Sequence, residues 1–86
     1  MNLKVSGKVQ GVFFRAATKE RADKLNIKGI VRNEPNGDVY IEAEGESEDV
    51  DHFVAWCKKG PAHAQVMTIV IEEAVKKGYV EFTILR

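Results

Sequence analysis

Apolar residues follow two spacings along the 86-residue chain. Alternation of apolar and polar residues predicts strands, because neighbouring side chains of a strand point to opposite faces. Recurrence every three or four residues predicts helices with one apolar side. In chain order the pattern predicts a strand over 2–9, a helix over 15–25, strands over 28–33 and 38–45, a helix over 47–59, and strands over 64–72 and 79–86.

Both predicted helices carry an apolar stripe. Ser47 is the predicted N-cap of the second helix, and Gly60 and Pro61 prevent its continuation. Its stripe consists of Val50, Phe53, Val54 and Cys57. The stripe of the first helix consists of Phe14, Ala17, Thr18, Ala22 and Leu25.

The strands differ in how their apolar residues are distributed. Segment 64–72 is apolar on both faces, which predicts a central strand. The pair Asn36-Gly37 predicts a hairpin between 28–33 and 38–45, since both residues accept positive φ. The final strand is expected to place Val80, Phe82 and Ile84 on one side.

The order of elements predicts one α+β domain over residues 1–86. The arrangement βαββαβ plus a short C-terminal strand is typical of a ferredoxin-like (split βαβ) sandwich, in which two helices cover one face of an antiparallel sheet. This fold carries many unrelated functions, so the function has to be argued from particular residues.

Charge and composition narrow the class of protein. The chain has 13 basic and 13 acidic residues and a formal net charge of zero, which argues against nucleic acid or an anionic membrane as partner. A single cysteine, Cys57, excludes an internal disulfide and a thiolate metal cluster. The N-terminus resembles no signal peptide, and no apolar run reaches the ~20 residues that span a bilayer. We therefore expect a soluble, cytoplasmic protein.

The stretch "GKVQGVFFR", residues 7–15, joins the first strand to the first helix. Gly11 allows a tight turn, and the start of a helix leaves unpaired N–H groups that bind anions. Arg15 adds a planar fork of donors, and Gln10 adds a polar group at the rim. The amides expected to converge are those of Gly11, Val12, Phe13, Phe14 and Arg15. Taken alone, this loop fits an ordinary turn as well as a phosphate site.

The stretch "GIVRN", residues 29–33, ends in Asn33. In a split βαβ sheet this strand can lie near the start of the first helix. The carbonyl and amide of Asn33 could then orient a water molecule in the same pocket. Taken alone, an asparagine before a turn is more often a cap than a functional residue.

Taken together, these stretches are similar to the acylphosphatase family over nearly the whole chain. The motifs G-x-V-Q-G-V-x-F-R and G-x-V-x-N are intact, and "NGDV", Phe53, Trp56 and "GPAHAQV" follow in the same order. The resemblance implies hydrolysis of the carboxyl–phosphate bond of an acyl phosphate. It also implies Arg15 as the phosphate ligand and Asn33 as the residue that orients the attacking water. Ile30 and Phe13 depart from residues common in the family, tryptophan and glycine respectively, which bears on rate and substrate fit.

Other candidate sites are weaker. A phosphatase loop built on Cys57 would require an arginine at position 63, which is a histidine, and Cys57 lies on an apolar stripe. His52 and His63 lack metal-ligand spacing and are expected at the surface. The acidic run "EAEGESED", residues 42–49, is expected to be solvated. Core positions are expected for Phe53 and Trp56, and Tyr40 with Tyr79 do not make an RNA-binding platform.

The function hypothesis is therefore an acylphosphatase that uses no metal and no cofactor. Its expected partners are an acyl phosphate substrate and inorganic phosphate as product or inhibitor, and its expected state is a monomer. The alternative is a non-catalytic phosphate-binding module with the same fold.

Overall fold

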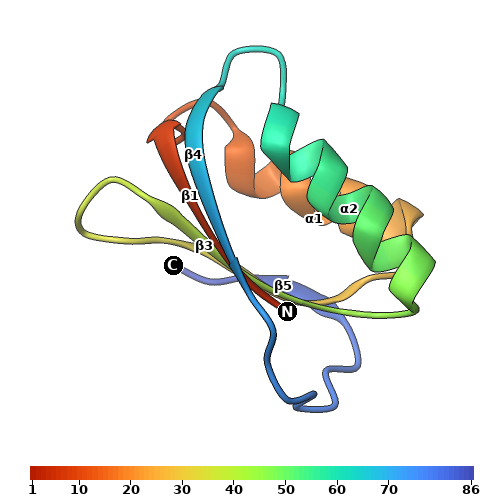
Figure 1. Cartoon of the computed structure of the whole chain (residues 1–86). Helices are drawn as coiled ribbons and strands as arrows, with labels where there is room; N and C mark the ends of the chain where they lie inside the picture. The colour runs from red at the N-terminus through yellow and green to blue at the C-terminus, as the bar shows by residue number, and fades with distance from the viewer.

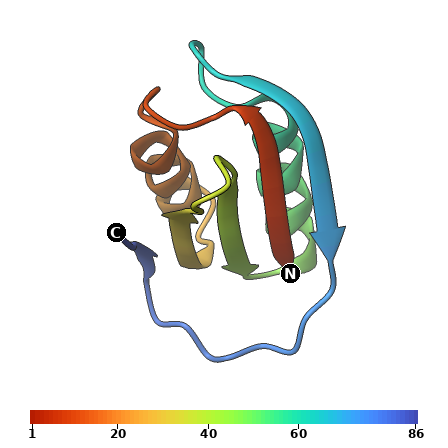
Figure 2. The same ribbon diagram turned by 90° about the vertical axis from the view of Figure 1, so that its left-hand side faces the viewer.

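A sheet of five strands and a layer of two helices enclose the core, and the computed structural model describes residues 1–86 (Figure 1). The elements are β1 (Asn2–Lys8), α1 (Phe14–Lys24), β2 (Lys28–Asn33), β3 (Val39–Glu44), α2 (Ser47–Lys59), β4 (Gln65–Glu72) and β5 (Phe82–Ile84). Both helices lie behind the same face of the sheet (Figure 2). The predicted order of elements and the ferredoxin-like architecture are confirmed.

The strand order across the sheet is β4-β1-β3-β2-β5 (Figure 2). The pairs β1–β3, β1–β4 and β2–β3 are antiparallel, but β5 runs parallel to β2. The prediction of an entirely antiparallel sheet was therefore wrong at this edge. The segment after β4 crosses the end of the sheet to reach the far edge (Figure 2), and this crossing brings β5 in parallel to β2.

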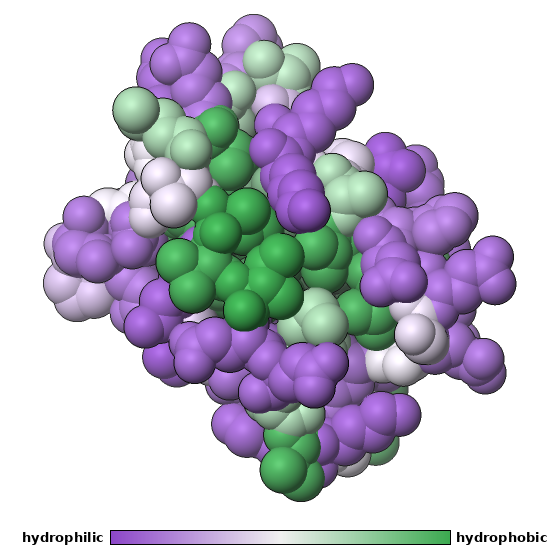
Figure 3. Space-filling view, in the orientation of Figure 1, coloured by the Kyte–Doolittle hydropathy of each residue, from purple (hydrophilic) through white to green (hydrophobic).

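The position of β4 also differs from the prediction. It is an edge strand, not a central one, and Met67 is 82% exposed. Val70 and Ile71 are also exposed, and apolar side chains gather over β4 in the space-filling view (Figure 3). A strand that is apolar on both faces is ambiguous, because the pattern describes side chains and not the number of neighbouring strands.

The core follows the predicted stripes. The fully buried side chains of largest volume are Phe14, Phe53, Phe82, Leu3, Ile27 and Ile41. Cys57 is buried as expected, and burial raises the pKa of its thiol to about 12. Trp56 is only partly buried, packed against the core beside Phe14. Neither helix has the length and apolar character that crossing a membrane requires.

Three local predictions need correction. Glu46, not Ser47, is the N-cap of α2, and it makes no side-chain capping bond. The hairpin between β2 and β3 is present, but only Gly37 of the Asn36-Gly37 pair has positive φ (97°). Pro35 precedes the pair, and a hydrogen bond from the Gly37 N–H to the Glu34 carbonyl closes the turn. Val80 is 87% exposed, since β5 begins only at Phe82.

The start of the acidic run is not solvated, contrary to the prediction. Glu42 is buried on the sheet face away from the helices and accepts hydrogen bonds from the hydroxyls of Tyr40 (2.7 Å) and Tyr79 (2.6 Å). The ammonium of Lys77 lies 2.9 Å from the same carboxylate. The Glu44 carboxylate accepts hydrogen bonds from the backbone N–H groups of Lys77, Gly78 and Tyr79. Two carboxylates of β3 thus hold the segment that leads into β5.

This anchor predicts a pH-dependent stability. Burial alone would raise the pKa of Glu42, but hydrogen bonds from Tyr79, Tyr40 and Lys77 outweigh it and hold the pKa at about 2, below the ordinary 4.5. The stabilisation is present above pH ~4.5 and is lost as the pH falls toward 2. We expect Glu42→Gln to lower the free energy of unfolding by about 2 kcal/mol at pH 7, with the difference vanishing toward pH 2. Urea unfolding between pH 2 and 7 measures it.

The matched control is Glu20→Gln, which removes an exposed carboxylate of a surface ion pair with Lys24. We expect this change to alter stability by less than about 0.5 kcal/mol. A Glu42→Gln effect that is independent of pH would contradict the assignment of the stabilisation to the ionised carboxylate.

Candidate active site

The loop between β1 and α1 contains two residues with a left-handed backbone conformation. Gly11 has φ 72° and Phe13 has φ 59°, and α1 begins directly afterwards at Phe14. No side chain caps this helix start. The backbone N–H groups of residues 11–16 donate no hydrogen bond to any backbone carbonyl of the chain. A run of free amides in such a turn at a helix N-terminus favours an anion.

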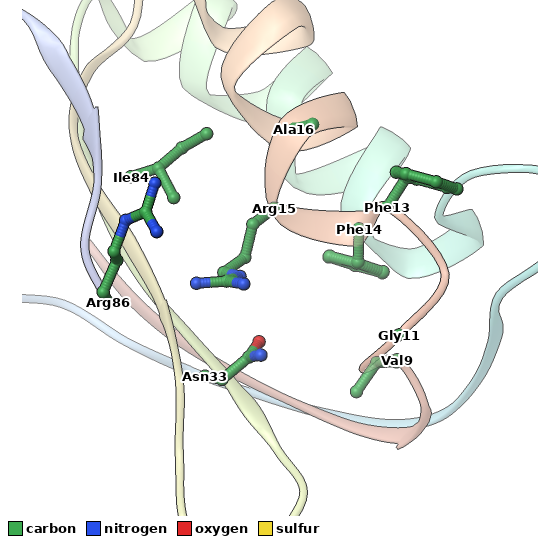
Figure 4. A pocket seen from close by; sticks show the side chains of 9 residues that line it. All are labelled: Val9, Gly11, Phe13, Phe14, Arg15, Ala16, Asn33, Ile84 and Arg86. Carbon is green, nitrogen blue, oxygen red and sulfur yellow. The ribbon is translucent and has the colours of Figure 1, made fainter.

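Arg15 lies in the first turn of α1, and its guanidinium points away from the helix toward β2 and the chain end (Figure 4). Its Nη1 donates to the backbone carbonyl of Leu85 at 3.1 Å. This bond uses one donor and fixes the plane of the fork, which leaves the other N–H groups for a ligand.

Asn33 is the last residue of β2, and its side-chain amide points toward the guanidinium of Arg15 (Figure 4). Gln10 holds the loop to the same region, since its Nε2 donates to the carbonyls of Glu34 (2.8 Å) and Asp38 (2.9 Å). The amide of Gln10 is thereby committed to the hairpin backbone. Gln10 fixes the loop that starts at Gly11 relative to the strand end that carries Asn33.

These elements enclose a pocket of about 380 Å³. It is lined by Val9, Gly11, Phe13, Phe14, Arg15, Ala16, Asn33, Ile84 and Arg86 (Figure 4). Two arginines and no acidic residue line it, and neither arginine takes part in an ion pair. The side chains that line the pocket are therefore cationic on balance, in a chain whose net charge is zero.

The structure brings together most of the predicted site residues. Arg15, Asn33, Gly11, Phe13 and Phe14 line the same pocket. Gln10 and Val12 do not line it, because the Gln10 amide binds the hairpin and Val12 packs against the core.

Sequence reasoning missed four lining residues, Val9, Ala16, Ile84 and Arg86, and the Leu85 carbonyl as a partner of Arg15. The missing information was the direction of the last strand. Once β5 is parallel to β2, its end comes to the end of β2 that carries Asn33.

The rival sites remain without support. His, Cys, Asp and Glu side chains form no group of three that could hold a metal ion. His52 and His63 are exposed, as predicted. Tyr40 and Tyr79 bind Glu42 through their hydroxyls.

The left-handed conformation of Phe13 predicts a gain of stability on replacement by glycine. Phe13 is 84% exposed, so little burial is lost, whereas a Cβ at positive φ costs about 1–2 kcal/mol. We expect the free energy of unfolding of Phe13→Gly to be about 1 kcal/mol higher than that of Phe13→Ala. The alanine variant removes the ring but keeps the Cβ. Urea unfolding of the two variants measures the difference. Equal stability of the two variants, or a more stable alanine variant, would show that the backbone here carries no such strain.

Comparisons of the sequence and of the structure with known proteins point to the same family. The acylphosphatase family model matches residues 1–84. An acylphosphatase of Rubrobacter xylanophilus is 51% identical over 74 residues, which are 86% of this chain and 67% of the relative. The structure is similar to that of an acylphosphatase from Coxiella burnetii, with a TM-score of 0.94 and 38% identity over 98% of this chain and 88% of that one. It is also similar to part of full-length HypF, solved in a phosphate- and nucleotide-bound form, with a TM-score of 0.88 and 34% identity over 99% of this chain and 11% of that one.

Proposed function

The chain belongs to the acylphosphatase family, and from this premise we propose how its own residues carry out the reaction. The protein is an acylphosphatase, which cleaves the carboxyl–phosphate bond of an acyl phosphate to give a carboxylate and inorganic phosphate. The observation that carries the proposed mechanism is the cationic pocket in which Arg15 and Asn33 face each other beside a run of free amides.

The phosphoryl group of the substrate occupies the turn at the start of α1. The free N–H groups of residues 11–15 bind its oxygens, and the guanidinium of Arg15 pairs with two of them. In phosphoryl transfer, charge is spread over the equatorial oxygens in the transition state. Donors that are already fixed in place stabilise that charge without reorganisation. The hydrogen bond from Arg15 Nη1 to the Leu85 carbonyl fixes the guanidinium in place before substrate binds.

Asn33 positions the water. Its carbonyl accepts a hydrogen bond from the water, and this orients a lone pair of the water toward phosphorus. The oxygen of the water forms a bond to phosphorus as the bond from phosphorus to the acyl oxygen breaks. The carboxylate leaves with the electron pair, and the protons of the water pass to solvent and to the released phosphate.

The residues present suit this substrate class. A carboxylate is a good leaving group, so the reaction does not depend on a strong base or on a covalent nucleophile. Positioning of water and stabilisation of charge supply the acceleration instead. The pocket offers these two contributions and contains no cysteine, histidine or carboxylate side chain.

The test of this function is turnover of the purified protein on two substrates. We incubate it with acetyl phosphate and with an ordinary phosphate monoester, with EDTA present because the proposal uses no metal, and measure inorganic phosphate. Hydrolysis of acetyl phosphate alone is the expected result. Hydrolysis of the monoester at a comparable rate would contradict the proposed reliance on an activated leaving group.

A second candidate function is a non-catalytic phosphate-binding module. A similar fold also occurs as a segment of a larger protein, since the match to HypF covers 11% of that chain. Saturable binding of inorganic phosphate without turnover of acetyl phosphate would support the module.

We further propose that the protein acts as a monomer in the cytoplasm. The residues that line the pocket lie together within a single chain, as a monomeric enzyme requires. The free, buried Cys57 suits a reducing compartment. Light scattering of the purified protein gives its mass in solution.

A further inference from the structure

The pocket extends beyond the groups that hold phosphate. At about 380 Å³ it falls within the range of sites that take a whole small molecule, ~300–1,000 Å³. The amide-rich loop forms one side of it, with Gly11, Phe13 and Phe14 (Figure 4). Ile84 and Arg86 form the opposite side, across Arg15, and come from the end of the chain (Figure 4). The acyl group of a bound substrate has to occupy the part of the pocket that phosphate leaves free.

The Arg86 side chain has no hydrogen-bond or ion-pair partner within the protein. It takes part in none of the ion pairs and lies in a pocket without an acidic residue. Arg15 differs, because its guanidinium is anchored to the Leu85 carbonyl next to Arg86 in the chain. A side chain that is exposed and unpaired keeps its full fork of donors for a ligand. Arginine pairs best with a planar carboxylate, which accepts two parallel N–H bonds.

We propose that Arg86 binds a carboxylate on the acyl group of the substrate, so that this enzyme favours acyl phosphates of dicarboxylic acids over those of simple fatty acids. This inference rests on the proposed function, because it assumes that the phosphoryl group lies against the loop and Arg15. Ile84 lies beside Arg86 and offers an apolar surface to the methylene groups between the two anionic ends (Figure 4).

The test compares two substrates of equal chain length. Adipoyl monophosphate ends in a carboxylate, and hexanoyl phosphate ends in a methyl group at the same position. We expect wild type to show the higher kcat/KM with adipoyl monophosphate. Arg86→Gln is expected to lower the preference for adipoyl monophosphate, the ratio of its kcat/KM to that of hexanoyl phosphate, about fivefold, the size of one exposed charge-assisted pair. Arg86→Lys keeps the charge and loses the fork of donors. We expect its preference for adipoyl monophosphate to lie between those of wild type and Arg86→Gln.

Arg21→Gln is the matched control for the loss of one positive charge. Arg21 lies on α1 outside this pocket, beside Trp56. We expect it to leave the ratio of the two kcat/KM values unchanged. An equal loss on both substrates in Arg86→Gln, or the same loss of preference in Arg21→Gln, would overturn the assignment of Arg86 to the acyl carboxylate.

A binding measurement separates this inference from the proposed function. Calorimetry with 6-phosphonohexanoate and hexylphosphonate requires no turnover. Arg86→Gln is expected to weaken binding of 6-phosphonohexanoate about fivefold more than binding of hexylphosphonate. Absence of hydrolysis by wild type overturns the catalytic proposal, whereas equal affinities for 6-phosphonohexanoate in wild type and Arg86→Gln overturn the role of Arg86.

Discussion

The Arg15→Ala variant is expected to release phosphate from acetyl phosphate about a thousandfold more slowly than wild type, a loss of roughly 4 kcal/mol of transition-state stabilisation. Arg15 is the lining residue that can pair with two phosphoryl oxygens at once while anchored to the protein through Leu85. Its removal takes away charge that the transition state needs and also weakens ground-state binding of phosphate. Both a lower kcat and a higher KM are therefore expected in steady-state assays.

Two controls make this result specific. Arg15→Lys keeps the positive charge but loses the fork, and we expect it to recover only a small part of the rate. Arg21→Ala removes an exposed arginine from the same helix, outside the pocket, and is expected to retain the wild-type rate. Urea unfolding shows whether each variant is folded at the assay temperature. A folded Arg15→Ala variant with a near-wild-type rate would contradict the phosphate-binding role.

The Asn33→Ala variant is expected to lose about a hundredfold or more in kcat with little change in KM. The reason is that Asn33 holds the attacking water, whereas the loop and Arg15 hold the phosphoryl group. Inorganic phosphate is accordingly expected to inhibit this variant as well as wild type. Steady-state assays with phosphate as inhibitor separate the two effects.

The companion variant is Asn33→Asp, which keeps the shape and an acceptor oxygen. It introduces a negative charge into a pocket that has to bind an anion, so we expect weaker phosphate inhibition in addition to the lower kcat. If Asn33→Ala instead raised KM and left kcat intact, Asn33 would be a substrate ligand and not the residue that orients water.

Much of the fold was predictable because helices and strands here obey local rules. The bounds of α2 follow from its stripe and from Gly60 and Pro61, and β2 matches "KGIVRN" residue for residue. The place of β4 at the edge and the parallel direction of β5 were not predictable in this way. Both depend on which strands pair across the sheet, and alternation of side chains along one strand carries no information about its neighbours.

In the candidate site, too, residues with a local chemical signal were predictable, whereas residues placed by strand pairing were not. The loop, Arg15 and Asn33 were candidates because each carries a chemical group suited to a phosphoryl group or a water molecule, and the resemblance to the family favoured these roles over an ordinary turn and a cap. Gln10 was assigned to the rim by its chemistry, but its amide holds the hairpin carbonyls. Arg86 gave no local signal, since an arginine at the end of a strand is usually solvated. Its place in the pocket arises from the position of β5 next to β2.

The dependence of Arg15 on Leu85 ties the active site to the shortest strand of the sheet. β5 has three residues, lies at an edge, and is followed by one hydrogen bond, donated by the Leu85 N–H to the Val31 carbonyl. Edges and chain ends open with far less free energy than global unfolding requires. Fraying of these last residues withdraws the carbonyl that orients the guanidinium while the core stays packed. We therefore expect the enzyme to lose activity on heating through local opening at β5, below the temperature at which the domain melts.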